Sequence, residues 1–577
     1  MPTASTRRGA KGARARKQTD AKPARARAAD DAPPRDFPGA PPDDVPERAW
    51  RVGVIVVLAV AVVLRFALLE LNPLHHDEGV NGWFLTRLLR QGEYAYDPKN
   101  YHGPTLYFIT LVPAFLLERV LRAGMSVFML RGVTSLFGVG IVWLVLCLRR
   151  YVGTVGALAA GALLAVSPGA VYQSRYFIHE TPFVFFTLAV VVAALKFYET
   201  TRAKYLMLAF GSAALLFATK ETAFISVGVL GLAWLVTRVW MRLAWRLRWE
   251  RFAGGDVERG ADLPRLGDET RLAVSFKNNL WRFGGAKHFG LLLLGGLALF
   301  LAVNVLFYSS FFTNREGVRA AVETFQFWSK TGMEELAHAK PLTTYLEWLQ
   351  QEEAPIYVLG LLGAAWALLG ARHRFALFAG AWAFGLLAAY SLVKYKTPWL
   401  SLNFAVPMAV AAGYAVGEAY RWARGREVLQ VVVLSLVVAG LAVSLYQTVV
   451  LNFYRYDDDK YPYVYSHTRR EFLDMLAEIE RVGEQTGMRE KMPVALASTD
   501  YWPIPWYMRD HAGLAYSAAP PFNQPVVITS AAQEASLDSP GVALRAALAQ
   551  SYDRAGEYPL RPGVELRLYV RRGLAGR

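Results

Sequence analysis

The stretch VGVIVVLAVAVVLRFALLEL, residues 52–71, decides the fold class of this chain. A helix needs about 20 mainly apolar residues to cross a bilayer, and this run meets that requirement with only two charged side chains. Comparable runs recur along the 577 residues, of which 54% are hydrophobic. We therefore expect a polytopic α-helical membrane protein with about 11 spans. The expected spans are residues 52–71, 127–148, 153–168, 181–197, 204–219, 222–241, 287–308, 355–371, 375–393, 400–420 and 428–450.

The segment NPLHHDEGV, residues 72–80, follows the first span at once and contains the acid pair Asp77-Glu78. Positions beside a span usually carry Lys, Arg, Trp or Tyr, so membrane anchoring explains two adjacent carboxylates poorly. A fixed carboxylate there can act as a general base or bind a cation. A solvated loop acid is the alternative interpretation.

The net charge of +16 favours a topology signal over a nucleic-acid partner, because the basic residues lie mainly in the N-terminal tail and in loops between spans. Residues 1–48 contain almost no large apolar side chains, so we expect a disordered basic tail in the cytoplasm rather than a cleaved signal peptide. The transmembrane domain then covers residues 49–451. The expected location is the cell's inner or plasma membrane.

The apolar stretch 104–121 decides the orientation of every later span. If it lies along the outer surface, the positively charged loops, including 242–286, all fall in the cytoplasm. If it spanned the bilayer, these loops would all face outward. The positive-inside rule therefore favours an interfacial helix at 104–121. The same parity places on the outer side residues 72–126, 169–180, 219–221, 309–354, 394–399 and everything after 451.

Residues 452–577 have the pattern of a small soluble α/β domain on the extracytoplasmic face. Residues 471–487 are amphipathic with helical spacing. The segment 498–510 is dense in Trp, Tyr and Pro, which pack sugar faces or lipid headgroups as readily as they pack a domain core. Short strands are expected at 493–498, 525–530 and 564–572.

Three turns on the outer side carry charged residues close to the membrane boundary. The first contains Arg175, His179 and Glu180 within six residues. Arg175 could bind a phosphate, and His179 or Glu180 a cation or a sugar hydroxyl. A helix cap with a local ion pair is the alternative for this turn.

The second turn contains Lys220 and Glu221, and the third contains Lys394 and Lys396. Lysines on the outer side oppose the positive-inside bias, so an anionic partner is expected. An internal Lys-Glu pair is the alternative for the second turn. If the three turns converge, they form a pocket for a lipid phosphate. Arg65, in the outer half of the first span, either snorkels to the interface or joins this site.

The sequence contains few residues typical of metal or redox sites. The single cysteine, Cys147, lies inside an apolar run, which excludes a disulfide framework and a cysteine-based metal site. His75 and His76 precede the acid pair and His102 follows it. A divalent cation is therefore a candidate cofactor, although the spacing matches no dedicated metal motif.

The chain resembles the GT-C glycosyltransferases, polytopic enzymes that take sugars from polyprenyl-phosphate carriers on the extracytoplasmic face. The resemblance rests on Asp77-Glu78 in the first outer loop, juxtamembrane helices at 84–91 and 104–121, and Ser167-Pro168 before Ser174-Arg175. The Lys220-Glu221 turn also matches. Over residues 50 to 240 the pattern is similar to the protein mannosyltransferase and aminoarabinose transferase families.

A closer resemblance is to a GT-C subfamily described as flippase-associated in archaeal protein glycosylation. It rests on His75-His-Asp-Glu-Gly79, Tyr101-His-Gly-Pro104, Lys396-Thr-Pro-Trp399 and Trp502-Pro-Ile-Pro-Trp-Tyr507. It covers most of the chain beyond the tail. Where many GT-C relatives have Lys-Pro-Pro, this chain has His102-Gly103-Pro104, which puts phosphate binding by that segment in doubt.

The resemblance implies that Asp77 is the general base, or orients the acceptor hydroxyl, with Glu78 in support. It also implies that Arg175, Lys220 and Lys396 hold the lipid phosphate. His179 and Glu180 would line the sugar site.

Three functions from different classes compete. The leading hypothesis is a glycosyltransferase that moves a sugar from a polyprenyl-phosphate donor to a lipid, glycan or protein hydroxyl. A flippase for lipid-linked sugars should show charged or broken helices near the midplane, whereas here the unusual polar residues lie at one face. A non-catalytic accessory protein of the same pathway is the third hypothesis.

Overall fold

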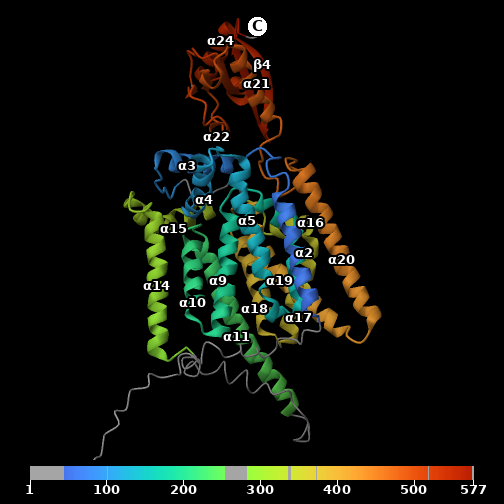
Figure 1. Ribbon diagram of the computed structural model, residues 1–577. Helices are drawn as coiled ribbons and strands as arrows, with labels where there is room; N and C mark the ends of the chain where they lie inside the picture. Colours follow the sequence, from blue (N-terminus) through green and yellow to red (C-terminus); the bar gives the residue numbers. More distant parts are fainter. Residues whose placement is uncertain are drawn as a thin grey trace, which may run out of the picture.

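The computed structural model describes residues 45–99, 102–253, 283–334, 339–371, 373–517 and 519–574. A long helical bundle carries a small domain at one end (Figure 1). The expected tail lies outside the described residues except for 45–48, and so does most of the loop 242–286.

The bundle confirms the expected membrane architecture. Eight described helices are long and apolar enough to cross a membrane, and two bent helix pairs pass the same test together. With the shorter apolar helix Ala203–Phe217, each expected span falls on a helix. The bundle helices are α2 (Glu47–Phe66), α5 (Val127–Leu146), α6 (Arg149–Val152), α7 (Thr154–Ala165), α8 (Pro168–Ser174), α9 (Glu180–Thr200), α10 (Ala203–Phe217), α11 (Ala223–Ala253), α14 (Ala286–Tyr308), α16 (Thr344–Glu352), α17 (Ala354–Gly370), α18 (Arg374–Leu392), η2 (Pro398–Ser401), α19 (Leu402–Trp422), α20 (Glu427–Val449) and η3 (Val450–Tyr454).

Helix α19 is the centre of the bundle, and its apolar span is buried throughout. Small residues let its backbone approach neighbouring helices closely, as is usual where helices associate in lipid. A Cβ atom added to Gly413 would lie 2.3 Å from the carbonyl oxygen of Gly156 on α7. By contrast, α14 and α20 bury only 6% of their apolar windows and present their side chains outward, as lipid-facing helices do.

Two helices lie at the end of the bundle that carries the small domain, namely α3 (His76–Gln91) and α4 (Thr105–Phe115), which η1 (Leu116–Val120) extends (Figure 1). With 11 residues α4 is too short to cross a bilayer. They correspond to the expected juxtamembrane helices, but α3 begins at His76 and not at 84. The acid pair therefore lies in the first helical turn and not in a loop. Another helix, α15 (Glu316–Glu334), follows α14.

The C-terminal residues form the expected α/β domain around a mixed sheet of order β2-β1-β3-β5-β4. β1 pairs in parallel with β2 and β3, whereas β5 pairs antiparallel with β3 and β4. The predicted helix and three predicted strands are present. The elements are α21 (Phe472–Gln485), η4 (Arg489–Lys491), β1 (Val494–Leu496), α22 (Ile504–Tyr507), β2 (Leu514–Tyr516), β3 (Val526–Ser530), α23 (Ala531–Ala535), α24 (Ser539–Ser551), β4 (Tyr552–Arg561) and β5 (Val564–Arg571).

Two strands had no clear sequence pattern. β2 has only three residues, too few for an alternating run to stand out. β4 contains Gly556 and Pro559, and its pairing with β5 shifts register beside both of them. Glycine and proline are depleted in strands, which hides this one from propensity.

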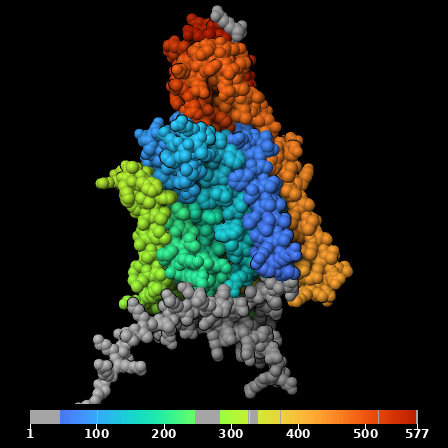
Figure 2. Space-filling view, in the orientation of Figure 1, coloured from blue at the N-terminus to red at the C-terminus, as the bar shows by residue number. Residues whose placement is uncertain are grey.

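The small domain rests directly on α3 (Figures 1 and 2). Trp506 is buried beside Gly82, and the Tyr507 hydroxyl accepts a hydrogen bond from the Leu74 amide at 2.9 Å. A Cβ atom added to Gly79 would lie 2.6 Å from Cβ of Pro503, closer than real Cβ atoms approach. The two glycines of α3 thus make the close contact between the bundle and the domain.

Gly79→Ala is expected to loosen this contact, although alanine favours the helix by about 1 kcal/mol over glycine. Overpacking costs about 1–3 kcal/mol. That cost would raise the population in which the small domain is separated from α3 by about 5- to 150-fold. Hydrogen exchange in α3 and α22 measures the change. Gly228→Ala is the control, since no atom lies within 4 Å of its added Cβ. Unchanged protection of α22 in Gly79→Ala would contradict the expected result.

Candidate active site

Asp77 is the exposed member of the acid pair. The Nδ1 atom of His75 caps α3 by accepting from the Asp77 amide at 3.0 Å, and the Glu78 carboxylate accepts from the His75 amide at 2.9 Å. This reciprocal capping box is why α3 begins here. The Asp77 side chain is 44% exposed, with Oδ2 3.9 Å from Nδ1 of His75.

His75 fixes this cap as a neutral ring. Burial, together with the nearby His467 and His76, lowers the pKa of His75 well below its usual range. Nε2 then carries the proton and donates to the Tyr465 carbonyl at 3.2 Å, which leaves Nδ1 to accept from Asp77.

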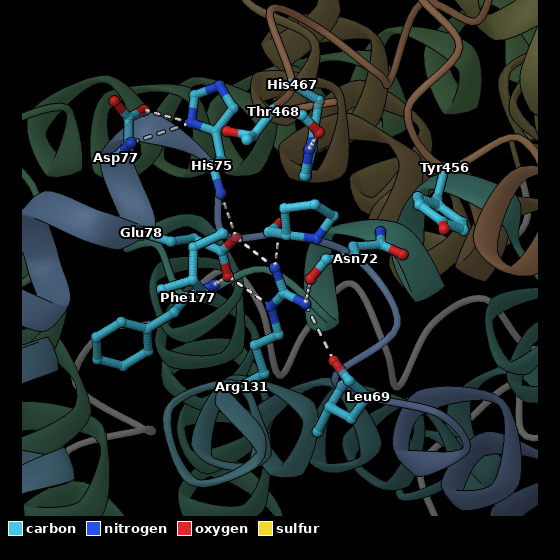
Figure 3. A network of polar contacts seen from close by, with 12 residues as sticks. Leu69, Asn72, His75, Asp77, Glu78, Arg131, Phe177, Tyr456, His467 and Thr468 are labelled. Atoms are coloured by element: carbon cyan, nitrogen blue, oxygen red, sulfur yellow. Dashed lines mark hydrogen bonds and ion pairs between the residues drawn. The ribbon is translucent and has the colours of Figure 1, made fainter. Parts of the chain in front are cut away.

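Glu78 is fully buried in an ion pair with Arg131 of α5 (Figure 3). Its Oε1 and Oε2 accept from Nε and Nη2 of Arg131 at 2.8 and 2.7 Å, a bidentate geometry. Oε1 also accepts from the Phe177 amide at 2.8 Å. The Arg131 guanidinium donates in addition to three carbonyl groups of the segment between α2 and α3, those of Leu69, Asn72 and Pro73.

This network supports a positioning role for Glu78 and not contact with substrate. Both carboxylate oxygens are occupied, and the ion pair holds together the end of α2, the start of α3 and the turn after α8. Burial alone would raise the pKa of the Glu78 carboxyl, but Arg131 and the two amide donors lower it overall. The neighbouring Asp77 is therefore presented on a rigid first turn.

The lowered pKa of Glu78 predicts how stability depends on pH. The folded pKa lies below that of an unfolded glutamate, about 4.3, so the ionised carboxylate stabilises the fold fully above that pH. The contribution disappears as the pH falls through the folded pKa. We expect the difference in melting temperature between wild type and Glu78→Gln to be constant from pH 8 to 5 and to shrink below about pH 4. A difference that grows on acidification would contradict this.

Arg175 and Arg65 are engaged with backbone and not turned toward a ligand site. Arg175 donates to the carbonyls of Ala67 at 2.6 Å and Leu68 at 2.8 Å, at the end of α2. Arg65 is buried and donates to the carbonyls of Leu164 and Ala165, at the end of α7. Such unpaired carbonyls at helix ends need donors, so both arginines serve as caps. For Arg175 this matches the cap alternative and offers no support for phosphate binding. Arg65 does not snorkel, and its Nε also donates to Oγ of Ser174, beside the first charged turn, at 3.2 Å.

The first two charged turns converge as expected. Lys220 is buried and pairs with Glu180 across the two turns, and His102 donates from Nδ1 to the Glu221 carboxylate at 3.0 Å. The buried His179 donates from Nε2 to the Gly103 carbonyl at 3.0 Å. The Lys220 pair is thus internal, but its partner is Glu180 and not the adjacent Glu221.

Gly103 lets the segment before α4 lie against this second turn. Its amide donates to the Thr219 carbonyl at 3.1 Å, and an added Cβ would lie 2.2 Å from the Ala218 carbonyl oxygen. This close approach gives a backbone reason for His102-Gly103-Pro104, the segment that departs from the family pattern. Tyr101, which belongs to the same motif, lies outside the described residues.

The third turn presents its two lysines differently. Lys394 is exposed, whereas Lys396 is buried with Nζ donating to the Val393 carbonyl at 2.6 Å. The Lys394 carbonyl accepts from the Lys340 amide at 3.2 Å, so the loop after α15 joins this turn. Lys340 is a further cation at the site that sequence reasoning missed.

Aromatic residues around His75 were also missed. The rings of Tyr176, His467 and Trp399 lie with centroids 5.1, 5.5 and 6.4 Å from that of His75. Among the described residues nothing is within hydrogen-bond distance of the buried Tyr176 hydroxyl. These residues are separated by up to several hundred positions, so no local pattern could have brought them together.

Metal binding stays a prediction. In the part of the chain that the structure describes, no group of three or more His, Cys, Asp or Glu side chains is placed to hold an ion. Burial of His75 and His467 against aromatic rings accounts for two of the histidines near Asp77.

Comparison with known proteins supports the expected superfamily. Residues 107–254 match the model of the dolichyl-phosphate-mannose-protein mannosyltransferase family. The structure of ArnT from Cupriavidus metallidurans in the apo state is similar, with a TM-score of 0.57 and 15% identity over 90% of this chain and 98% of that one. The same protein bound to undecaprenyl phosphate gives 0.54 and 15% over 91% and 99%. No curated protein matches the sequence at a significant level.

A third similar structure is the Archaeoglobus fulgidus oligosaccharyltransferase in the apo form, with a TM-score of 0.50 and 14% identity over 83% of this chain and 65% of that one. At these identities the structures establish the fold. Together with the matching family model they confirm the resemblance to GT-C glycosyltransferases. The finer resemblance to the flippase-associated subfamily stays a prediction.

Proposed function

Because the chain has the GT-C glycosyltransferase fold, we propose that it transfers a sugar from a polyprenyl-phosphate donor to a hydroxyl group of a lipid, glycan or protein acceptor. The observation that carries this proposal is the placement of Asp77. It is the partly exposed carboxylate on a helix start that is locked by the buried Glu78–Arg131 pair. A rigidly held, accessible carboxylate is what a general base requires.

The reaction is a single displacement at the anomeric carbon. Asp77 accepts the proton of the acceptor hydroxyl while that oxygen forms a bond to the anomeric carbon. The bond between this carbon and the phosphate oxygen breaks, the oxygen keeps both electrons, and the polyprenyl phosphate leaves as an anion. The anomeric configuration is inverted. Asp77 then returns its proton to solvent.

Cations that face the leaving phosphate lower the barrier by stabilising its developing charge. Lys394 is exposed, which suits a lipid phosphate arriving from the bilayer, and Nζ of the nearby Lys340 lies 5.5 Å from the centroid of the Tyr465 ring. The neighbour ArnT has been solved with undecaprenyl phosphate bound, which supports a polyprenyl carrier here. Lys220 stays paired with Glu180 and would reach a phosphate only by exchanging that partner. Lys396, buried on the Val393 carbonyl, would position this turn.

Four polar side chains link the first two charged turns to the segment before α4, namely His102, His179, Glu180 and Glu221. Their hydrogen bonds run between the turns and hold the starts of α9 and α11 against the segment before α4. Of these side chains, that of His102 is 26% exposed and the one best able to meet a sugar hydroxyl.

The site belongs on the extracytoplasmic face, with the N-terminus in the cytoplasm. Supporting this orientation, the basic residues between spans lie at the other end of the bundle, where α9 ends beside Arg202 and α19 ends beside Arg421. The positive-inside rule assigns that end to the cytoplasm. The C-terminal domain then lies outside with α3 and α4.

Turnover in proteoliposomes tests the function. The purified full-length chain is supplied with radiolabelled polyprenyl-phosphate sugars, with water as the acceptor hydroxyl, and both bond cleavage and movement of the headgroup across the bilayer are measured. We expect cleavage with inversion at the anomeric carbon. Movement of an intact donor across the membrane would instead assign a flippase, and absence of both activities would favour an accessory role.

A further inference from the structure

A row of aromatic rings leads from the acid pair onto the C-terminal domain. His76 lies 6.4 Å from Trp502, Trp502 lies 5.7 Å from Tyr501, and Tyr501 lies 5.5 Å from Tyr516, measured between ring centroids. We call these four residues the aromatic row. It joins α3 to the loop after β1 and to the end of strand β2.

The far end of the row, at Tyr516, is exposed, and a charged pair lies beside the row. Tyr516 is 57% exposed, and Tyr501 and Trp502 are partly exposed. Asp500, which precedes Tyr501, forms an ion pair with Arg561, and its side chain is 44% exposed. Because Asp500 directly precedes Tyr501 in the chain, this ion pair lies beside the row. Tyr501 also packs against the apolar core of the small domain, whereas Tyr516 is more than half exposed.

The foot of the row is fixed beside Asp77. Pro503 contacts α3 at Gly79, and the Trp502 ring lies 3.3 Å from the position of a Cβ at that glycine. His76 is the residue directly before Asp77. A molecule lying along the row therefore ends at the carboxylate that we assign as the base.

We propose that the aromatic row binds the carbohydrate part of the acceptor, so that the acceptor is a glycan or a glycolipid headgroup; calling this ligand the acceptor rests on the proposed function. Flat rings with an accessible face pack against the apolar faces of sugars, and Tyr hydroxyls together with an Asp-Arg pair supply hydrogen bonds to sugar hydroxyls. Lipid chains lack groups for the charged pair, and the row lies on the small domain above the bundle.

Binding to immobilised glycans tests the row without any donor. The labelled full-length protein in nanodiscs is applied to an array of neutral and charged oligosaccharides, with wild type compared with Tyr516→Ala and Trp502→Ala. Leu537→Ala is the control, since this side chain is 89% exposed in the same domain. We expect wild type and the control to bind a subset of the glycans, and both aromatic variants to bind it about 5- to 10-fold more weakly.

The proposed function is tested separately. In the same nanodiscs, transfer of the donor sugar to water is measured. This donor turnover is measured on wild type, and the aromatic variants are judged by glycan binding alone. The proposed role of the aromatic row is wrong if wild type binds no glycan, or if the aromatic variants bind glycans as tightly as wild type. This conclusion does not depend on whether donor turnover is observed. If wild type binds a peptide or anionic vesicles but no glycan, and the aromatic variants lose that binding, the proposed carbohydrate ligand is wrong. Absent donor turnover in wild type overturns the proposed function alone.

Discussion

Asp77→Asn is expected to lower the rate of sugar transfer by about 10²- to 10⁴-fold, the usual worth of a positioned general base. Asparagine keeps the size of the side chain and cannot accept the hydroxyl proton. The Asp77 backbone amide still donates to His75, so the cap of α3 remains. The measurement is the initial rate of sugar release and of product formation in proteoliposomes, with donor binding determined separately. We expect binding of the donor to change little.

The matched control is Asp553→Asn. Its side chain is 57% exposed and pairs with Arg572 at 3.2 Å, away from α3, so its transfer rate should equal that of wild type. The free energy of unfolding of both variants should lie within about 1 kcal/mol of the wild-type value, because neither change leaves a buried charge unpaired. Transfer by Asp77→Asn at more than half the wild-type rate would contradict its assignment as the base.

Glu78→Gln is expected to be among the most destabilising single changes in the chain. It leaves the buried Arg131 guanidinium without its counter-charge, and breaking a buried ion pair costs about 3–5 kcal/mol. The measurement is the free energy of unfolding, or the thermal midpoint in a fixed detergent. The double variant Glu78→Gln with Arg131→Met should be less destabilised than the sum of the single variants, because it removes both charges.

The control for this pair is the exposed ion pair of Arg87 and Glu93, whose side chains are 43% and 64% exposed at a separation of 2.8 Å. Arg87→Met should cost less than about 1 kcal/mol, as exposed pairs do. Glu78→Gln should also slow transfer, since the turn that carries Asp77 loses its support. Equal stability losses for Glu78→Gln and Arg87→Met would show that the buried pair does not organise the site.

For two charged residues, the partners in the structure differ from those that the local sequence pattern predicts. Arg175 has the charge and position of a phosphate ligand in the sequence, yet it donates to carbonyls more than 100 residues earlier. Lys220 does form an internal pair, but with Glu180 and not with its neighbour in sequence. In both cases burial removes competing water, so the nearest unsatisfied partner in space takes the charge.

The sequence by itself determined the spans, the juxtamembrane position of α3 and α4, and the α/β character of the C-terminal domain. These follow from apolar run length, charge and short-range periodicity, which act along the chain. Only the tertiary structure decided that Glu78 pairs with Arg131, that Arg175 and Arg65 are helix caps, and that Trp502 lies beside Gly79. Such contacts join residues 50 to more than 400 positions apart. They form because side chains pack together and because buried polar groups need hydrogen-bond partners. The local sequence pattern contains no information about either requirement.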